Sequence, residues 1–434
     1  MLHILSNTRF ATLYAAQVAA LLGTGLLTIG LALLAYDLAG AAAGAVLGTA
    51  LAIKMVAYVG VAPLAQAVVA SVPRKAVLIL ADLVRAAVAL SLPFVDAIWQ
   101  IYGLIFVLQA ASATFTPTFQ ATIPDILPDE EDYTRALSLS RLAYETENVL
   151  SPVLAGILLS FIAFNWLFLG TVIGFLVSAI LVSRTELPAL TAVTERPFRD
   201  RLSLGLRIYF ATPRLRGLMA LNLAVAAAGA FVIVNTVVLM AGDGGAVARA
   251  MTAFGAGSVI AALALPQILK RGPDRRVMMT AAWGLVGVTA GLVVVLGLGH
   301  ATTSVIWAIW AATGAMATTI MTASGRLLAR STHKDTRPAV FTAQFAASHA
   351  CWLVTYPLAG WSGAGLGLPA SAAILLLLAI AGTLMASRVW PPNTRDPVLH
   401  SHDDLPQDHP HLAKYDQAHA HPIIIDDVHP RWPT

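Results

Sequence analysis

Charged side chains are scarce in this sequence, and so is cysteine. Asp, Glu, Lys and Arg make up 12% of the 434 residues, whereas 58% of the residues are apolar. The mean hydropathy is +0.75. A soluble globular protein carries about 25% charged residues, so this composition excludes an ordinary soluble enzyme. The single cysteine excludes a disulfide framework and any zinc or iron–sulfur module built from cysteines.

Nucleotide-binding and catalytic motifs are also missing. No G-x-x-x-x-G-K-[ST] run occurs, so the sequence has no cradle for the phosphates of ATP. The net charge of +4 comes without a basic soluble face, so we expect no nucleic-acid partner. No reactive constellation stands out, so we expect no enzymatic activity and no permanently bound cofactor. Any energy-requiring step of this protein is therefore expected to draw on an ion gradient, or on the gradient of a substrate, rather than on ATP.

Twelve apolar segments are each long enough to cross a bilayer, which takes about 20 helical residues. In the first half they cover 10–36, 43–70, 76–95, 98–118, 137–161 and 165–183, and in the second half 217–240, 247–269, 277–299, 303–325, 339–362 and 369–390. The first segment is too long for a signal-peptide core and is expected to be retained. These runs lack the strict alternation of β-barrel strands. The sequence therefore predicts an all-α membrane protein with twelve transmembrane helices in contact with lipid.

Lys and Arg predict the orientation of these helices. With the N-terminus in the cytoplasm, every Lys or Arg in a loop except Arg249 falls on the cytoplasmic side. Basic loops stay on the cytoplasmic side of a membrane. We therefore expect a multi-pass protein of the cell inner (plasma) membrane with both termini in the cytoplasm.

The spans divide into two halves with a repeated feature. The loop after the second span reads SVPRK and the loop after the eighth reads GPDRR. We predict a six-helix bundle over 1–184, a cytoplasmic linker over 185–216, a second six-helix bundle over 217–390 and a disordered tail over 391–434. Duplicated halves around a central site are typical of secondary transporters.

The two repeated loops resemble a signature of the major facilitator superfamily. The first keeps the basic pair Arg74 and Lys75, and the second keeps Asp274, Arg275 and Arg276. SPVLAG in the fifth span resembles the antiporter motif of the same family. The resemblance implies the twelve-helix fold of that family, alternating access and exchange with protons.

A narrower resemblance is to NreB-type nickel-resistance exporters within that superfamily. It rests on GRLLARSTHKDTRPAVFTAQFAASHACWLVTYPLAGW (325–361) and on the histidine-rich tail. The resemblance implies export of Ni²⁺, or of a related divalent cation such as Co²⁺, by proton antiport.

Three charged residues inside the spans are candidates for transport or proton coupling. Lys54 lies near the middle of the second span, and Glu145 and Glu147 lie in the fifth. A charge at this depth costs about 2.5–3.5 kcal/mol on insertion scales, so each needs a partner, a water-filled cavity or a function. We predict that Lys54 meets Glu145 or Glu147 at a central cavity. The alternative is a permanent ion-pair network.

The other charges of the first half are assigned to gating or to structural ion pairs. Asp82 and Arg85 are three residues apart and share a helix face, and Arg141 shares a face with Glu145. With the two repeated loops they form the predicted gating network: Arg74, Lys75, Asp82, Arg85, Arg141, Asp274, Arg275 and Arg276.

The second half offers polar rather than charged candidates. Asn222 and Asn235 are predicted to line the cavity from the seventh span. His349, in the eleventh span, is interpreted either as a transient ligand and proton carrier or as a structural histidine between helices. Imidazole suits late first-row divalent metals.

The tail carries three histidine pairs at i and i+2 spacing: His400 and His402, His409 and His411, His419 and His421. In an extended chain such residues share one side, so each pair is a candidate site for Ni²⁺ or another divalent cation. The alternative is a solvated extension without ligand.

Three functions stay open at this point. The first is export of a divalent metal, with the proton as coupling ion. The second is efflux of an organic drug or siderophore through the same fold, with the tail incidental. The third, more remote, is a membrane metal sensor that does not transport. We expect a monomer whose partners are lipid and a small inorganic cation or small molecule.

Overall fold

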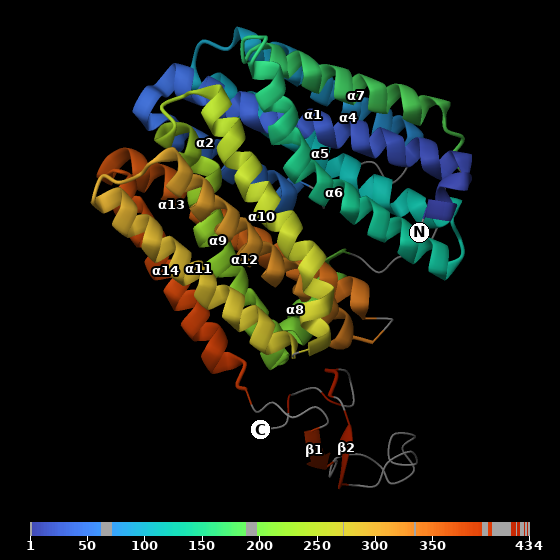
Figure 1. Cartoon of the computed structure of the whole chain (residues 1–434). Helices are drawn as coiled ribbons and strands as arrows, with labels where there is room; N and C mark the ends of the chain where they lie inside the picture. Colours follow the sequence, from blue (N-terminus) through green and yellow to red (C-terminus); the bar gives the residue numbers. More distant parts are fainter. Residues whose placement is uncertain are drawn as a thin grey trace.

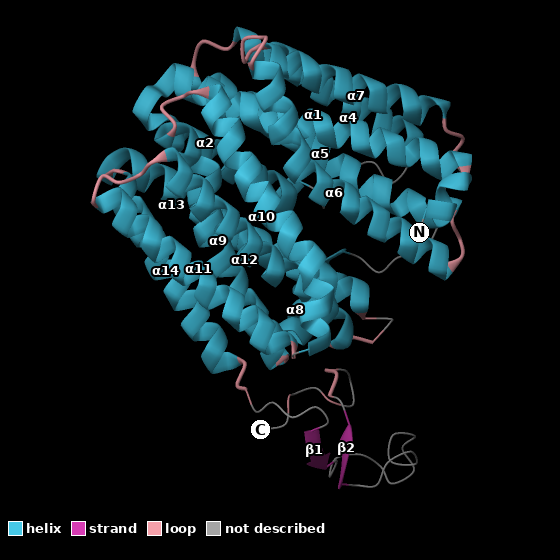
Figure 2. Cartoon of the chain, in the orientation of Figure 1, coloured by secondary structure: helices cyan, strands magenta, loops and turns pink. Residues whose placement is uncertain are grey.

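The computed structural model describes residues 2–61, 72–187, 198–271, 273–333 and 336–392, and in the tail 398–401, 418–421, 423–425, 429 and 432. Almost all of this is helix, and the two strands lie in the tail (Figure 2). The first six long helices are α1 (Thr8–Ala39), α2 (Ala43–Val56), α4 (Arg74–Ser91), α5 (Ile98–Ile126), α6 (Glu130–Leu159) and α7 (Trp166–Arg184). After α8 (Phe198–Ala211) come α9 (Pro213–Leu239), α10 (Gly244–Arg271), α11 (Asp274–Gly297), α12 (Thr303–Arg330), α13 (Arg337–Leu366) and α14 (Leu368–Val389).

Each of the twelve predicted spans overlaps one of these helices, and the second, predicted over 43–70, runs into residues 62–70, which lie outside the described part of the chain. Within the described residues, nine stretches are long and apolar enough to cross a membrane. This set counts α1 and α2 as one stretch, because only a short 3-10 turn at Gly40 (φ +53°) separates them. It leaves out α6 and α13, whose sequences are interrupted by charged or polar side chains. The fold class is thus an all-α membrane protein, as predicted.

The long helices pack as two bundles (Figure 1). In the N-terminal bundle, α1 packs on α6 and α7, and α4 packs on α5 and α7. In the C-terminal bundle, α9 packs on α13 and α14, and α12 packs on α10 and α11. The bundles meet through α2 with α13 and α6 with α10. Buried apolar side chains fill the space inside each bundle. Because lipid is as apolar as these side chains, it is their close packing, rather than transfer out of water, that stabilises the contacts between the helices.

The two ends of the molecule differ. Arg74, Arg184, Arg275 and Arg330 lie at helix termini on one side, here called the basic end. The helices of the two bundles converge at the opposite end and diverge toward the basic end (Figure 1).

Glycines allow the close approach at the opposite end. A Cβ on Gly48 would lie 2.5 Å from the Tyr356 carbonyl oxygen, and one on Gly360 would lie 2.1 Å from the Gly44 carbonyl oxygen. Small residues let helix backbones approach in this way. This contact closes the space between α2 and α13 at the opposite end.

The described parts of the tail differ from the disordered segment that we expected. Strand β1 (Val398–Ser401) pairs antiparallel with β2 (Ala418–His421). Ile423 and Ile425 are 0% and 1% exposed and belong to the core of the C-terminal bundle. Prolines in the tail disfavour a long helix, but fully burying an isoleucine contributes about 1.5–3 kcal/mol, which offsets the entropy of ordering it.

Candidate functional site

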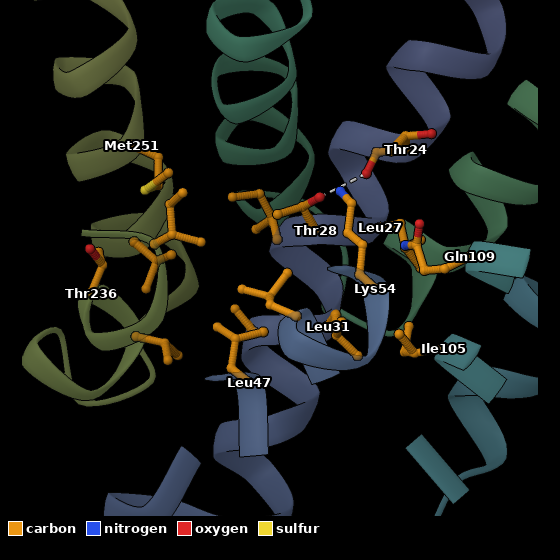
Figure 3. A pocket seen from close by; sticks show the side chains of 16 residues that line it. Thr24, Leu27, Thr28, Leu31, Leu47, Lys54, Ile105, Gln109, Thr236 and Met251 are labelled. Atoms are coloured by element: carbon orange, nitrogen blue, oxygen red, sulfur yellow. Dashed lines mark hydrogen bonds between the residues drawn. The ribbon is translucent and has the colours of Figure 1, made fainter. Parts of the chain in front are cut away.

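A cavity of about 40 Å³ lies between the bundles, where α1, α2 and α5 face α9 and α10 (Figure 3). Its polar lining residues are Thr24, Thr28, Lys54, Gln109 and Thr236, and the other lining side chains are aliphatic or methionine. Small-molecule sites are typically apolar with a few placed polar groups. This cavity is the candidate site.

Lys54 brings the cationic group into the cavity from the last turn of α2. Figure 3 shows its amine directed toward Thr24 and Thr28, on the neighbouring α1. The Thr28 hydroxyl donates to the Thr24 carbonyl at 3.0 Å. The Lys54 Nζ lies 5.9 Å from the centroid of the Tyr58 ring, at the outer limit of a cation–π contact. Among the described lining residues, Lys54 thus supplies the one charged group.

Glu147 lies behind this wall, on α6. Its Oε1 is so close to Gly25 of α1 that a Cβ there would come within 2.7 Å. Its carboxylate interacts electrostatically with Lys54. The structure therefore places Glu147 within electrostatic reach of Lys54, while the role of both residues in proton coupling stays a prediction. The side chains of Glu145 and Arg141 lie outside the described part of the chain.

His349 approaches the same lysine from the C-terminal bundle. Its Nδ1 donates to the Phe345 carbonyl of the preceding turn at 2.7 Å. Its ring centroid lies 6.0 Å from that of Tyr58, and the imidazole interacts electrostatically with Lys54. Tyr58 therefore joins Lys54 to His349 across the bundle interface. Tyr58 was not predicted, since it is one tyrosine in an apolar run and nothing in the sequence distinguishes it.

Asp82 and Arg85 form an ion pair inside the N-terminal bundle. Asp82 is fully buried and also accepts a 2.7 Å hydrogen bond from the Ser178 hydroxyl of α7. The Arg85 guanidinium lies 4.2 Å from the centroid of Phe115 and 4.5 Å from that of Phe175. These contacts join α4, α5 and α7 of one bundle, so the geometry favours the structural alternative over gating for this pair.

The first predicted loop forms an ion pair at the basic end. Arg74, at the start of α4, pairs with Asp125 near the end of α5. Lys75 follows Arg74 in the first turn of α4 and is half-buried. Asp125 was not predicted, because nothing local in the sequence indicates that the ends of α4 and α5 meet.

The second predicted loop forms a similar set at the start of α11. Asp274 pairs with Arg326 Nε at 3.3 Å and with Arg330 Nη1 at 3.2 Å, both on α12. Arg275 donates from Nε to the Trp390 carbonyl at the end of α14. Arg276 is exposed. The two repeated loops thus link helices within their own bundles.

The two predicted cavity asparagines lie away from the lining. Asn235 is 1% exposed and donates to the Ala359 carbonyl at 3.1 Å. Its Oδ1 is close to Gly44 and Gly363, where the bundles touch at the opposite end. Asn222 is 7% exposed within α9. Neither belongs to the cavity wall, so Asn235 contributes to the closed contact instead.

Three of the six paired tail histidines lie within the described residues. The register of β1 and β2 places His400 opposite His419, and His421 opposite Val398. His402, His409 and His411 lie outside the described residues. Among the side chains that the structure describes, no group of three or more His, Cys, Asp or Glu is arranged to hold a metal ion.

Comparison with known proteins places this geometry in a family. The Major Facilitator Superfamily profile matches residues 13–241. Macrolide efflux protein A of Streptococcus pyogenes is 26% identical over 187 residues, which cover 42% of this chain and 45% of that protein. The uncharacterized MFS-type transporter YfiS of Bacillus subtilis is 26% identical over 109 residues, 25% of this chain and 26% of that protein.

Solved structures show the same fold over most of the chain. The nucleoside transporter NupG has a TM-score of 0.65 at 14% identity, covering 88% of this chain and 98% of that chain. A D-xylose-proton symporter has a TM-score of 0.66 at 12% identity, covering 88% and 97%. The family match and this shared fold lead to one conclusion: the chain belongs to the Major Facilitator Superfamily and is a multi-pass membrane transporter.

Proposed function

We propose that this protein is a proton-coupled efflux transporter for an amphipathic organic molecule. The observation that carries the proposal is the wall of the central cavity, which is apolar except for Lys54, Gln109 and three threonines. Such a wall suits an apolar body with a hydrogen-bonding group. The partial similarity to a protein named for macrolide efflux supports the same substrate class.

Lys54 and Glu147 supply the coupling in this proposal. While Glu147 is ionised, its carboxylate attracts the Lys54 ammonium. When Glu147 takes up a proton this attraction ends, and the ammonium is free to enter the cavity, where it displaces the substrate. Proton and substrate thus occupy the transporter in turn, so that alternating access exchanges one proton for one substrate molecule. The basic end faces the cytoplasm of the cell inner membrane, in agreement with the basic loops.

Divalent-metal export is the second candidate, favoured by the tail. The backbone register pairs His400 with His419, so one histidine of the first pair lies opposite one histidine of the third pair. Imidazole binds Ni²⁺ and its neighbours well. In this alternative the tail collects Ni²⁺ or Co²⁺ at the basic end and His349 passes it on. The central cavity argues against metal export, because the described residues that line this cavity include no His, Cys, Asp or Glu.

A growth assay separates the two candidates. A drug-sensitive and nickel-sensitive host is challenged with graded macrolides and dye-like drugs, and separately with NiCl₂ and CoCl₂. We expect drug resistance that is lost in Lys54→Met, with unchanged nickel tolerance. A His400→Ala/His419→Ala double variant is the matched control and should keep drug resistance. Nickel resistance without drug resistance, abolished by the double variant, would overturn the proposal in favour of metal export.

A further inference from the structure

The hydroxyl groups that line the central cavity donate their hydrogens to the backbone of their own helices. Thr24 donates to the Ala20 carbonyl at 2.9 Å, and Thr28 donates to the Thr24 carbonyl at 3.0 Å. Thr236 donates to the Val232 carbonyl. A hydroxyl group has a single hydrogen to donate. None of the three lining threonines therefore has a donor left for a molecule in the cavity.

Thr236, on the C-terminal side of the cavity, is held in addition by the neighbouring helix α12. The indole Nε1 of the fully buried Trp310 donates to the Thr236 hydroxyl oxygen at 2.8 Å. Both hydrogen bonds of this hydroxyl therefore run to residues of its own bundle. The other described lining residues of that bundle are apolar: Ile233, Val237, Val247 and Met251. The C-terminal wall thus offers a substrate mainly apolar contact.

The donors of the cavity belong to the opposite wall, in the N-terminal bundle. Figure 3 shows Lys54 and Gln109 on one side of the cavity and Thr236 and Met251 on the other. Gln109, on α5, is 6% exposed, and within the described part of the chain its amide makes no hydrogen bond. Nearly all buried polar groups in native proteins have a hydrogen-bond partner. A buried amide that lines a cavity without one therefore indicates a ligand that supplies it.

We propose that Gln109 determines the specificity of this cavity, which takes molecules whose polar group is a hydrogen-bond acceptor, such as a carbonyl oxygen. This inference rests on the proposed efflux function and names the polar group of its substrate. An amide has two N–H donors and one acceptor oxygen. In the proposed complex the Gln109 oxygen faces the Lys54 ammonium, and the N–H groups face the substrate oxygen.

The proposed coupling gives Gln109 this role rather than Lys54. While Glu147 is ionised it attracts the Lys54 ammonium, so Gln109 is the donor left to the substrate. A site built to hydrogen-bond a substrate rejects an analogue that lacks the matching group, because the polar group of the protein then stays buried and unpaired. A molecule with a donor but no acceptor is therefore a poor substrate.

The test measures efflux of two naphthalene dyes of similar size from energised cells of a host without its main drug pumps. Prodan has a carbonyl oxygen and no N–H or O–H group, whereas N-phenylnaphthylamine has an N–H donor and no carbonyl. Gln109→Leu removes the amide donors at similar volume, and Gln109→Met is a second, unbranched variant without them. Gln120→Leu is the matched control, because Gln120 is exposed on the same helix and does not line the cavity.

We expect the wild-type protein and Gln120→Leu to export prodan at least fivefold faster than N-phenylnaphthylamine. Both Gln109 variants should export prodan at least threefold more slowly and keep N-phenylnaphthylamine efflux, which also shows that they fold. If both variants keep the wild-type ratio of the two rates, or lose both dyes equally with unchanged thermal unfolding midpoints, this inference is wrong and the proposed function stands. If the wild-type protein exports neither dye and gives no drug resistance, the proposed function fails as well.

Discussion

Substituting Gly360 by alanine should open the contact between the bundles at the opposite end. The new Cβ would lie 2.1 Å from the Gly44 carbonyl oxygen and 3.0 Å from the Ala45 Cα. These are backbone atoms, so no side chain can rotate away. Overpacking of this kind costs about 1–3 kcal/mol. A free-energy change of 1.4 kcal/mol alters an equilibrium constant tenfold. The ratio of molecules closed at this end to molecules open there should therefore fall by a factor of about 5 to about 150.

Cysteine labelling measures this shift. Thr24→Cys places a reporter in the central cavity, in a Cys351→Ser background that removes the native thiol. A membrane-impermeant maleimide added to whole cells should label Gly360→Ala at least fivefold faster than its parent. Gly365→Ala, on the same helix, is the control because a Cβ there meets nothing within 4 Å. Equal labelling of the parent and Gly360→Ala, with both variants folded, would refute the reasoning.

Three further predictions concern polar and charged side chains within the helix bundles. Arg85→Met leaves the carboxylate of Asp82 buried without its cation. We therefore expect the free energy of unfolding to fall by about 3–5 kcal/mol, which is measured as a lower unfolding midpoint in detergent. An unchanged midpoint would contradict this. Glu147→Gln should abolish the pH dependence of efflux in vesicles while the exposed control Glu186→Gln keeps it, and retained pH dependence would dismiss Glu147 as the proton carrier. Trp310→Phe loses a 2.8 Å indole hydrogen bond to α9, which should cost about 1 kcal/mol by denaturant titration; a stability equal to wild type would argue against that bond.

The sequence predicted the helices well because lipid imposes one simple rule. Every backbone polar group in the bilayer must be satisfied within the helix, so a long apolar run is a nearly sufficient signal. The prediction was less accurate where polar residues enter a helix. For α6 the apolar signal begins near 137, but the helix starts at Glu130, because the charged first turns lie outside the apolar region and are helical all the same.

The candidate site was predicted only in part. Lys54 stood out because an isolated charge in an apolar run is costly and easy to find. Tyr58, Gln109 and Asp125 did not stand out, since their importance depends on which helices meet, and helix pairing leaves little trace in one sequence. The buried Ile423 was missed for a different reason: the prolines around it indicated an extended tail, and short apolar groups in such tails carry little weight in composition.

The helix that follows the linker has a consequence for how the two halves can be cut and rejoined. α8 packs on α13, where a Cβ on Gly205 would lie 2.0 Å from the Ala339 carbonyl oxygen. The Tyr209 hydroxyl of α8 donates a hydrogen bond to the side chain of Gln344, which is on α13. Burial raises the pKa of the Tyr209 phenol, so the hydroxyl keeps the proton that it donates. α8 therefore travels with the C-terminal half as one rigid piece. The junction of a chimera, or the cut that separates the two halves, should accordingly lie between Arg184 and Phe198, ahead of α8. A junction at 217 would remove α8 from the C-terminal half, on which it packs.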